Sequence, residues 1–333
     1  MRFPAIRQNL DEWLDHPGFV PLFLLVLSIL AYGLMIPWLH LYIDDWLWHW
    51  TWERMGSAGL VKYFATNRPV WGLLYQVTLS ILYPNILAYH IFALLVRWAS
   101  GVVIWWFFRL LWPNRPWTAL IGGALFLLYP GFALQPIALT YAHIFLVYIF
   151  FLLSLCFTLL ALKNRKRFWI YTIISLVLSL ANLLMMEFFF TLEAARLFVI
   201  WVVIGRETPD LSQRFKRTLL HWLPYLLAFI SAAFWRTFIF KFQNYRYQFD
   251  LAGQLKAAPL QTLSELALKI GEDLGEVSLG AWWPAVERLA QIKLRLATGV
   301  VTLLVIASIT ALVFIVILLK LLRQPAKEKR WSL

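Results

Sequence analysis

Long apolar segments constrain this chain more than any other feature. An α-helix rises 1.5 Å per residue, so crossing the hydrocarbon core of a bilayer takes roughly 20 apolar residues. Segments of about this length recur along the 333 residues. They lie at 18–40, 85–110, 117–135, 137–161, 168–186, 188–204, 218–240 and 297–321. Because helices satisfy their own backbone groups in lipid, the sequence predicts an all-α, polytopic membrane protein with about eight transmembrane helices.

The composition agrees with this class. The chain is 62% hydrophobic and 14% charged, with a mean hydropathy of +0.70, which lies outside the range of soluble globular proteins. Its 19 Trp, 13 Tyr and 26 Phe predict aromatic belts at the membrane interfaces, or a groove for an apolar or sugar-bearing ligand. The single cysteine, Cys156, lies in an apolar run and excludes a disulfide framework and a Cys-based metal site.

The distribution of basic residues predicts the orientation. The N-terminus carries charges of both signs and no cleavage site follows the first apolar run, which we interpret as a retained helix. With the N-terminus in the cytoplasm, 17 of the 30 Lys and Arg lie on the cytoplasmic side, with the largest groups at 163–167, 206–217 and 320–330. The net charge of +13 is therefore interpreted as cytoplasmic loop charge, not as a nucleic-acid surface. We expect residence in the cytoplasmic membrane.

The apolar pattern divides the chain into three parts. Residues 1–240 form a transmembrane module whose first external loop is 41–84, and the apolar stretch 70–83 within it is too short to cross and predicts an interfacial helix. Residues 241–296 are more polar and predict a small external cap of amphipathic helices. Residues 297–333 predict a last transmembrane helix and a basic cytoplasmic tail.

Two adjacent carboxylates, Asp44 and Asp45, follow the first apolar segment among several Trp residues. Such a pair is either a helix cap in a solvated loop or an acid/base and metal site. Residues 46–54 predict a second, short interfacial helix, and Asp45 directly precedes it, so Asp45 is placed to cap that helix. We assign the chemistry to Asp44 and the cap or metal ligand to Asp45, and the reverse assignment is equally open.

Four further residues near the predicted external surface are candidates for ligand binding. Arg68 precedes Pro69 at the start of the interfacial helix, where it either binds an anion or anchors the helix to headgroups. Glu187 lies at a tight turn with no other charge within five residues, which makes it a functional candidate. Arg236 either holds a phosphate or anchors to headgroups. His143 opens the fourth predicted span, where a lone histidine is more often structural than catalytic.

Charged residues also occur inside the predicted spans. Glu193 and Arg196 are three residues apart on one helix face, which predicts a local ion pair. The same pair is the predicted partner of Arg97, which falls in the middle of a span. The chain has no Gly-rich phosphate loop and no dinucleotide fingerprint, so a soluble nucleotide is not an expected substrate.

The order of these features resembles the GT-C superfamily of integral-membrane glycosyltransferases. The resemblance rests on the acidic pair after the first span, the Asn67-Arg68-Pro69 sequence before an interfacial helix, Glu187, and the Glu-x-x-Arg-Leu sequence that starts at Glu193. It covers roughly residues 18–240 and depends on order and topology more than on a strict motif. The most similar branch is the bacterial one that resembles protein O-mannosyltransferases and aminoarabinose transferases.

The resemblance implies a hexosyl- or pentosyltransferase that moves a sugar, with inversion, from a polyprenyl-phosphate donor. The acceptor would be a saccharide, lipid or protein at the extracytoplasmic face. Asp44 or Asp45 would be the general base or would hold a divalent ion such as Mg or Mn. Arg68 and Arg236, with Glu187 and His143, would bind the substrate and its phosphate.

Other functions fit the same sequence. A transporter or flippase of lipid-linked saccharides would line its path with Arg97, Glu193 and Arg196. The chain has about eight predicted spans and lacks the large external domain that follows the last span in many such enzymes. An inactive or partial GT-C-like protein, or a non-catalytic assembly partner, is therefore a further alternative.

Overall fold

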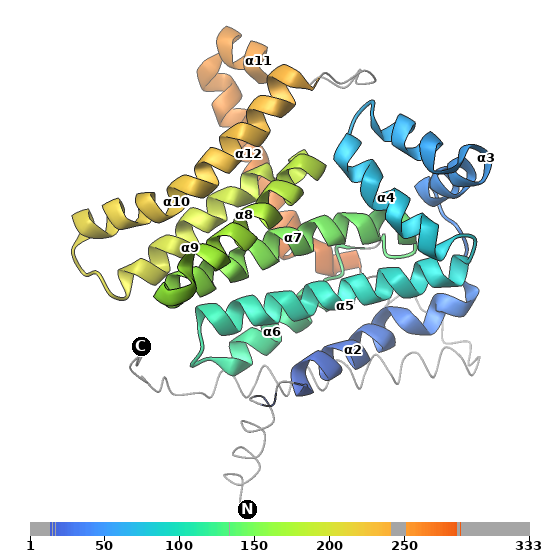
Figure 1. Cartoon of the computed structure of the whole chain (residues 1–333), viewed down its shortest axis with the longest axis horizontal. Helices are drawn as coiled ribbons and strands as arrows, with labels where there is room; N and C mark the ends of the chain where they lie inside the picture. The colour runs from blue at the N-terminus through green and yellow to red at the C-terminus, as the bar shows by residue number, and fades with distance from the viewer. Residues whose placement is uncertain are drawn as a thin grey trace, which may run out of the picture.

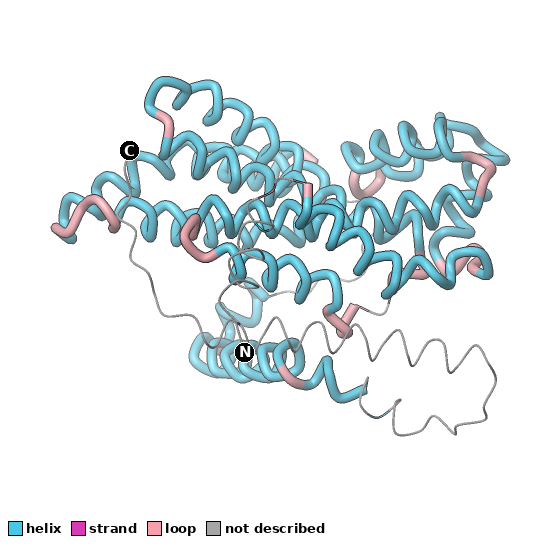
Figure 2. The backbone as a smooth tube through the Cα atoms, turned by 90° about the horizontal axis from the view of Figure 1, so that it is seen from below, coloured by secondary structure: helices cyan, strands magenta, loops and turns pink. Residues whose placement is uncertain are grey.

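The structure is a computed structural model that describes residues 14, 16, 18–132, 134–240, 251–284 and 287. These residues form helices joined by short connections, with no strand among them (Figures 1 and 2). The helices are α2 (Phe19–Tyr32), α3 (Asp44–Phe64), α4 (Pro69–Leu82), α5 (Ile86–Leu111), α6 (Pro116–Leu128), α7 (Ala138–Lys163), α8 (Phe168–Met185), α9 (Glu193–Gly205), α10 (Leu211–Phe234), α11 (Leu251–Ala257) and α12 (Pro259–Ser278). The predicted all-α class is confirmed.

Among the residues that the structure describes, six helical segments are long and apolar enough to cross a membrane. They are Phe19–Trp38, Ile86–Leu111, Ala138–Lys163, Arg165–Met185, Glu187–Gly205 and Leu211–Ile239. The predicted span at 297–321 lies outside the described residues, and the predicted span at 117–135 corresponds to α6, which has only 13 residues. The structure thus supports a polytopic helical membrane protein with six candidate spans among the described residues.

Helix α6 ends earlier than the hydropathy of 117–135 predicted because of its local sequence. Tyr129 precedes Pro130, whose ring disfavours helical backbone in the residue before it. Tyr129 accordingly has ψ 114°, and the helix stops at Leu128. A hydropathy average over 117–135 counts the apolar residues on both sides of this stop and does not detect it.

Arg97 stabilises the early end of α6. Its Nη2 donates to the backbone oxygen of Leu127 at 3.0 Å, and the Tyr32 hydroxyl donates to the same oxygen at 2.6 Å. The guanidinium also lies over four aromatic rings, those of Tyr32, Phe126, Phe132 and Phe145. A cation at a helix C-terminus interacts favourably with the helix dipole. Arg97 therefore binds a helix end and aromatic faces, and the prediction that it pairs with Glu193 is wrong.

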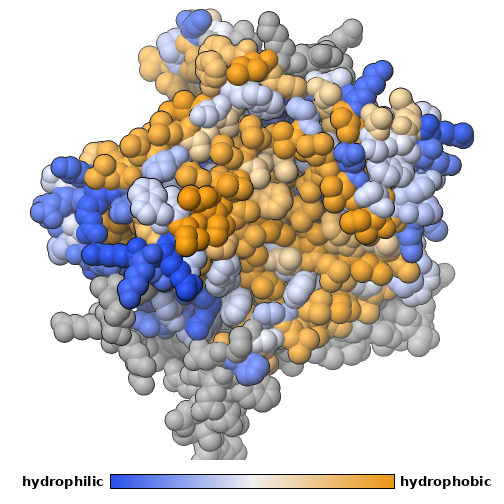
Figure 3. Space-filling view, in the orientation of Figure 1, coloured by the Kyte–Doolittle hydropathy of each residue, from blue (hydrophilic) through white to orange (hydrophobic). Residues whose placement is uncertain are grey.

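Helices α5 to α10 lie side by side and run roughly along one direction, with α3 and α4 at one end (Figure 1). A broad hydrophobic surface covers the middle of this face, and hydrophilic residues lie at its left and right edges (Figure 3). The connection between α7 and α8 carries exposed Arg165, Lys166 and Arg167 at the end opposite α3. This banding is the arrangement that a bilayer requires.

The region predicted to lie at the membrane interface is helical and consists of α3 and α4. Helix α4 confirms the helix predicted at 70–83, with Pro69 in its first turn. Helix α3 is longer than predicted and contains a break at Gly56. The ring of Trp48 in α3 stacks on Phe64 at 4.8 Å and lies 5.2 Å from the ring of Tyr75 in α4. An aromatic core thus holds the two helices together beside the bundle.

The break in α3 requires glycine. Gly56 has φ 61° and ψ −163°, a conformation that residues with a Cβ rarely adopt. We expect Gly56→Ala to reduce the free energy of unfolding by about 1–3 kcal/mol, measured by thermal unfolding in detergent. Gly271→Ala in α12 is the matched control, because an added Cβ there meets open space at an ordinary φ. Equal stability of the two variants would show that the break does not depend on glycine.

The external cap predicted at 241–296 is helical where the structure describes it. Helices α11 and α12 follow α10, and the Tyr129 hydroxyl donates to the backbone oxygen of Val277 in α12 at 2.9 Å. Residues 241–250 and most of 285–296, like the tail predicted at 297–333, lie outside the described residues.

Candidate functional site

All six predicted site residues lie at the ends of helices that meet at the α3 end of the bundle, because neighbouring helices are antiparallel. They are Asp44, Asp45, Arg68, His143, Glu187 and Arg236. Helices α7 and α8 are antiparallel neighbours, so the start of α7 and the end of α8 lie at one end. Helix α10 runs antiparallel to α9 and returns to the same end. The segments Asp44–Phe64 and Pro69–Leu82 complete this end (Figure 1).

Asp45 is buried and caps a helix distant from it in sequence. Its Oδ2 accepts from the backbone N–H of Leu139 at 3.1 Å, and its Oδ1 accepts from the N–H and the hydroxyl of Thr140 at 3.0 and 3.1 Å. These are first-turn N–H groups of α7, which have no partner within their own helix. The prediction of a cap was right in kind, but the helix that Asp45 caps is α7, not the one that begins beside it.

Burial and hydrogen bonding act on Asp45 in opposite directions. Burial raises the pKa of its carboxyl group to about 6, although the hydrogen bonds from Thr140 and Leu139 favour the charged form. Trp48 supports the arrangement, because its Nε1 donates to the Thr140 hydroxyl oxygen at 2.8 Å. Asp45 is thus buried, and both of its carboxylate oxygens are used in hydrogen bonds that join α3 to α7.

Asp44, in contrast, is exposed at the start of α3. Its charge and that of Arg68 both act on Tyr75 in α4. Burial raises the pKa of Tyr75 well above its ordinary value, and the negative charges of Asp45 and Asp44 raise it further. The positive charge of Arg68 lowers it. Asp44 begins α3 and Arg68 immediately precedes α4, so both lie in the part of the structure where α3 and α4 pack together.

Glu187 joins two arginines from distant parts of the chain. Its Oε1 accepts from Arg68 Nη2 at 2.6 Å, and its Oε2 accepts from Arg68 Nε at 3.2 Å. The same Oε2 accepts from Arg236 Nη2 at 3.0 Å. Arg236 Nη1 donates to the backbone oxygen of Asn67 at 2.7 Å. We call Arg68, Glu187 and Arg236 the Glu187 cluster; the sequence predicted each of them separately, and the structure brings them together.

Each member of the Glu187 cluster is held by the end of a helix. Arg68 immediately precedes α4, Glu187 begins the 3-10 segment Glu187–Leu192 after α8, and Arg236 lies in the π-helical turn Trp235–Ile239 after α10. The Arg68 guanidinium lies over the rings of Trp71 and Phe188, at 5.5 and 5.0 Å from their centres. Two guanidinium groups at converging helix ends, with aromatic walls, suit the binding of an anionic group attached to an apolar chain.

His143 does not belong to this cluster. It is fully buried in α7, with Nδ1 next to the backbone oxygen of Leu139 and Nε2 2.9 Å from the Thr78 hydroxyl. Its ring stacks on Tyr75 with 3.8 Å between the ring centres. Both ring nitrogens therefore have partners inside the protein, and the prediction that His143 binds substrate is not supported.

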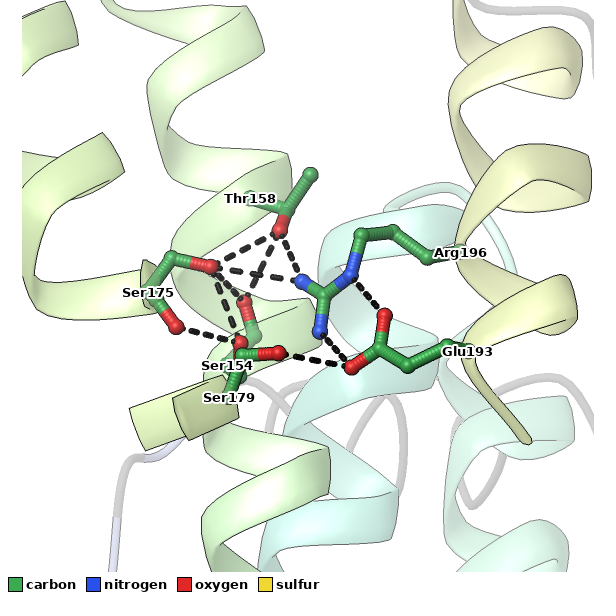
Figure 4. Close-up of polar contacts among 6 residues, drawn as sticks. All are labelled: Ser154, Thr158, Ser175, Ser179, Glu193 and Arg196. Atoms are coloured by element: carbon green, nitrogen blue, oxygen red, sulfur yellow. Dashed lines mark hydrogen bonds and ion pairs between the residues drawn. The ribbon is translucent and has the colours of Figure 1, made fainter. Parts of the chain in front are cut away.

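A second polar cluster is enclosed among α7, α8 and α9 (Figure 4). Arg196 Nε and Nη2 donate to the two carboxylate oxygens of Glu193 at 2.7 and 2.8 Å, which confirms the predicted ion pair. Arg196 Nη1 donates to the Thr158 hydroxyl at 2.7 Å, and Ser179 donates to Glu193 Oε1 at 2.7 Å. The hydroxyls of Ser154 and Ser175 complete the network. We call these six residues the Glu193–Arg196 network.

The sequence analysis missed the hydroxyl groups of this network. Ser154 and Thr158 are four residues apart in α7, and Ser175 and Ser179 are four apart in α8. Pairs at this spacing lie on one helix face. Two such pairs in neighbouring apolar helices are a signal that could have predicted the partners of Arg196.

The acidic pair does not supply the expected metal site. Both carboxylate oxygens of Asp45 accept hydrogen bonds from the start of α7, which leaves Asp44 as the exposed carboxylate of the pair. Among the residues that the structure describes, no three His, Cys, Asp or Glu side chains are grouped as metal ligands. The donor set at Asp44 and Asp45 therefore does not fit a divalent ion held by both.

Comparison with known proteins adds no relative to this description: no family model, no curated protein and no solved structure matches the chain. The class that fold and site define is a polytopic helical membrane protein with a two-arginine cluster at one end of its bundle.

Proposed function

We propose that the protein is a membrane glycosyltransferase that takes a sugar from a polyprenyl-phosphate donor and transfers it at the extracytoplasmic face. The observation that carries the proposal is the convergence of Arg68 and Arg236 on one carboxylate, at the end of the bundle where α3 begins with the exposed Asp44. Such a donor has a charged phosphate on an apolar chain. A two-arginine cluster beside a membrane-spanning bundle offers the phosphate its cations and leaves the chain in lipid.

The proposed reaction uses Asp44 as the general base. Its carboxylate removes the proton of an acceptor hydroxyl, and the acceptor oxygen attacks the anomeric carbon of the sugar. The bond from this carbon to the phosphate oxygen breaks on the opposite side, which inverts the configuration. The electron pair leaves with the polyprenyl phosphate, and Arg68 and Arg236 stabilise its added negative charge. No step involves a metal ion.

Two features of the chain support the extracytoplasmic side for this reaction. The α7–α8 and α9–α10 connections carry the short basic loops, and these lie at the opposite end from Asp44. Basic residues in short loops favour the cytoplasm. If that end is cytoplasmic, α2 would run from a cytoplasmic N-terminus to the extracytoplasmic end, as the proposed orientation requires.

The transporter or flippase alternative is less well supported. It assigns a substrate path to Arg97, Glu193 and Arg196, which are 1%, 4% and 0% exposed. Arg196 and Glu193 bind each other and neighbouring hydroxyls, and Arg97 binds the end of α6. Arg97 Nε and Nη1 are buried without a hydrogen-bond partner, but the guanidinium is enclosed by aromatic rings. Side chains enclosed in this way do not line an open path.

The test is sugar transfer or donor hydrolysis by the purified protein with a panel of polyprenyl-phosphate sugars. We expect Arg68→Gln and Arg236→Gln to lower the rate at least about 100-fold, because each removes a cation from the leaving phosphate. Lysine at either position is expected to restore only part of the rate, since it lacks the bidentate fork. Arg54→Gln, an exposed arginine of α3 outside the cluster, should retain the wild-type rate. No turnover of any donor by the wild type would contradict the proposal.

A further inference from the structure

We propose that the Glu187 carboxylate occupies the position of the anionic ligand in the Glu187 cluster and is displaced when a prenyl phosphate binds. This inference rests on the proposed function, which assigns the phosphate to Arg68 and Arg236. It adds that the structure shows the ligand-free form of the site, in which the Glu187 carboxylate binds both arginines in place of the phosphate.

The contacts of Glu187 resemble those that an incoming phosphate would make. Arg68 presents its Nε and Nη2 to the carboxylate as a two-pronged fork, which is also how arginine binds phosphate oxygens. Arg236 adds a third hydrogen bond to the same carboxylate. Because two anions held by the same donors repel each other, a phosphate on these forks requires Glu187 to leave.

Glu187 is the member of the cluster whose side chain is least enclosed by the rest of the protein. Its side chain is 29% exposed, whereas those of Arg68 and Arg236 are 11% and 12% exposed. Arg68 lies against the buried Trp71, and Arg236 is tied to the backbone of Asn67. Glu187 instead begins the six-residue segment Glu187–Leu192, a 3-10 helix between α8 and α9.

The Glu193–Arg196 network limits this movement to the short segment. Glu193 and Arg196 lie in the first turn of α9, directly after Leu192, and are bound to hydroxyls of α7 and α8. The start of α9 is therefore fixed. Displacement of Glu187 would move the neighbouring Phe188, which is 66% exposed and lies over Arg68.

When a side chain of the protein competes with the ligand, the apparent dissociation constant equals the intrinsic one divided by the fraction of molecules in which the competing side chain has left the site. The test is calorimetric titration of the full chain in detergent with farnesyl phosphate, a short prenyl phosphate. If Glu187 is displaced in about one molecule in ten, Glu187→Gln should bind about tenfold more tightly than the wild type. Arg68→Gln should lose binding, inorganic phosphate should bind more weakly, and farnesol should not bind.

The outcomes separate this inference from the proposed function. Binding to the wild type that Arg68→Gln abolishes, but that Glu187→Gln leaves equal or weaker, overturns displacement and keeps the phosphate site. Absence of binding to both the wild type and Glu187→Gln overturns the phosphate site itself. Inorganic phosphate binding as tightly as farnesyl phosphate overturns the lipid assignment.

A second measurement keeps Glu187 in place. Cys156 is fully buried, so a cysteine introduced as Phe188→Cys can be labelled alone with an environment-sensitive fluorophore. We expect its emission to change saturably with farnesyl phosphate. The same label at Phe215→Cys, an exposed position near the other end of the bundle, should not respond. An unchanged Phe188→Cys signal at concentrations where farnesyl phosphate binds would overturn the displacement.

Discussion

Replacing Arg196 with methionine is expected to lower the free energy of unfolding by about 3–5 kcal/mol, because the change leaves the Glu193 carboxylate buried without its cation. Arg196 is fully buried, and its guanidinium makes both hydrogen bonds to the carboxylate that define the ion pair. It also lies 4.3 Å from the ring centre of Tyr225 in α10. One side chain therefore links four helices, α7 to α10. Thermal unfolding of the detergent-purified variant measures the loss.

A double variant provides the matched control for this prediction. Removing both charges in Glu193→Leu/Arg196→Met leaves no isolated carboxylate, and apolar replacement of a complete buried pair is often close to neutral. We therefore expect the double variant to recover most of the stability that Arg196→Met loses. The surface pair of Arg217 and Glu207, at 3.9 Å and with both side chains at least 40% exposed, gives the comparison for an exposed arginine. Arg217 also donates to the Thr208 hydroxyl at 2.6 Å, so Arg217→Met should cost at most about 1–2 kcal/mol, below the loss expected for Arg196→Met.

Equal stability of Arg196→Met and Arg217→Met would contradict this account. It would show that the Glu193 carboxylate is not held as an anion in the bundle. The ion pair would then have no structural role, and a place on a substrate path would become the better explanation for Glu193 and Arg196.

The sequence predicts the fold where the signal is local. Apolar length predicted the helices that became α2, α5 and α7, and Pro69 marked the start of α4. A local signal was also present at Tyr129-Pro130, but hydropathy averaged over about 20 residues does not weigh it. The break at Gly56 cannot be predicted from apolar periodicity, because the chain is helical on both sides of this single residue.

The site was predictable in its members but not in its pairings. Arg68, Glu187 and Arg236 stand out because charge in apolar surroundings requires a partner. Their mutual contacts join positions 49 to 119 residues apart and depend on the order in which helices pack. The same holds for Asp45, which caps a helix at Leu139, 94 residues further along the chain. It also holds for Arg97, whose partner is the end of α6, a helix end that averaged hydropathy did not predict.

The two adjacent aspartates are expected to fail in different ways when each is changed to asparagine. Asp44→Asn should lower sugar transfer by about 10²- to 10⁴-fold, because it removes the proposed general base. Its stability should stay near that of the wild type, since Asp44 is exposed at the start of α3. The rate of transfer and the thermal midpoint, measured on the same preparation, test both statements.

Asp45→Asn should reduce stability first. An asparagine offers one carbonyl oxygen to the N–H groups of Leu139 and Thr140, and its NH2 group must face the other donor. We expect the change to cost about 1–3 kcal/mol of unfolding free energy, with a rate that falls only as far as the folded fraction falls. The reverse pattern, with a stable but inactive Asp45→Asn and a fully active Asp44→Asn, would move the base to Asp45. It would also mean that the α7 cap opens during the reaction, because both oxygens of Asp45 are otherwise bound to that helix.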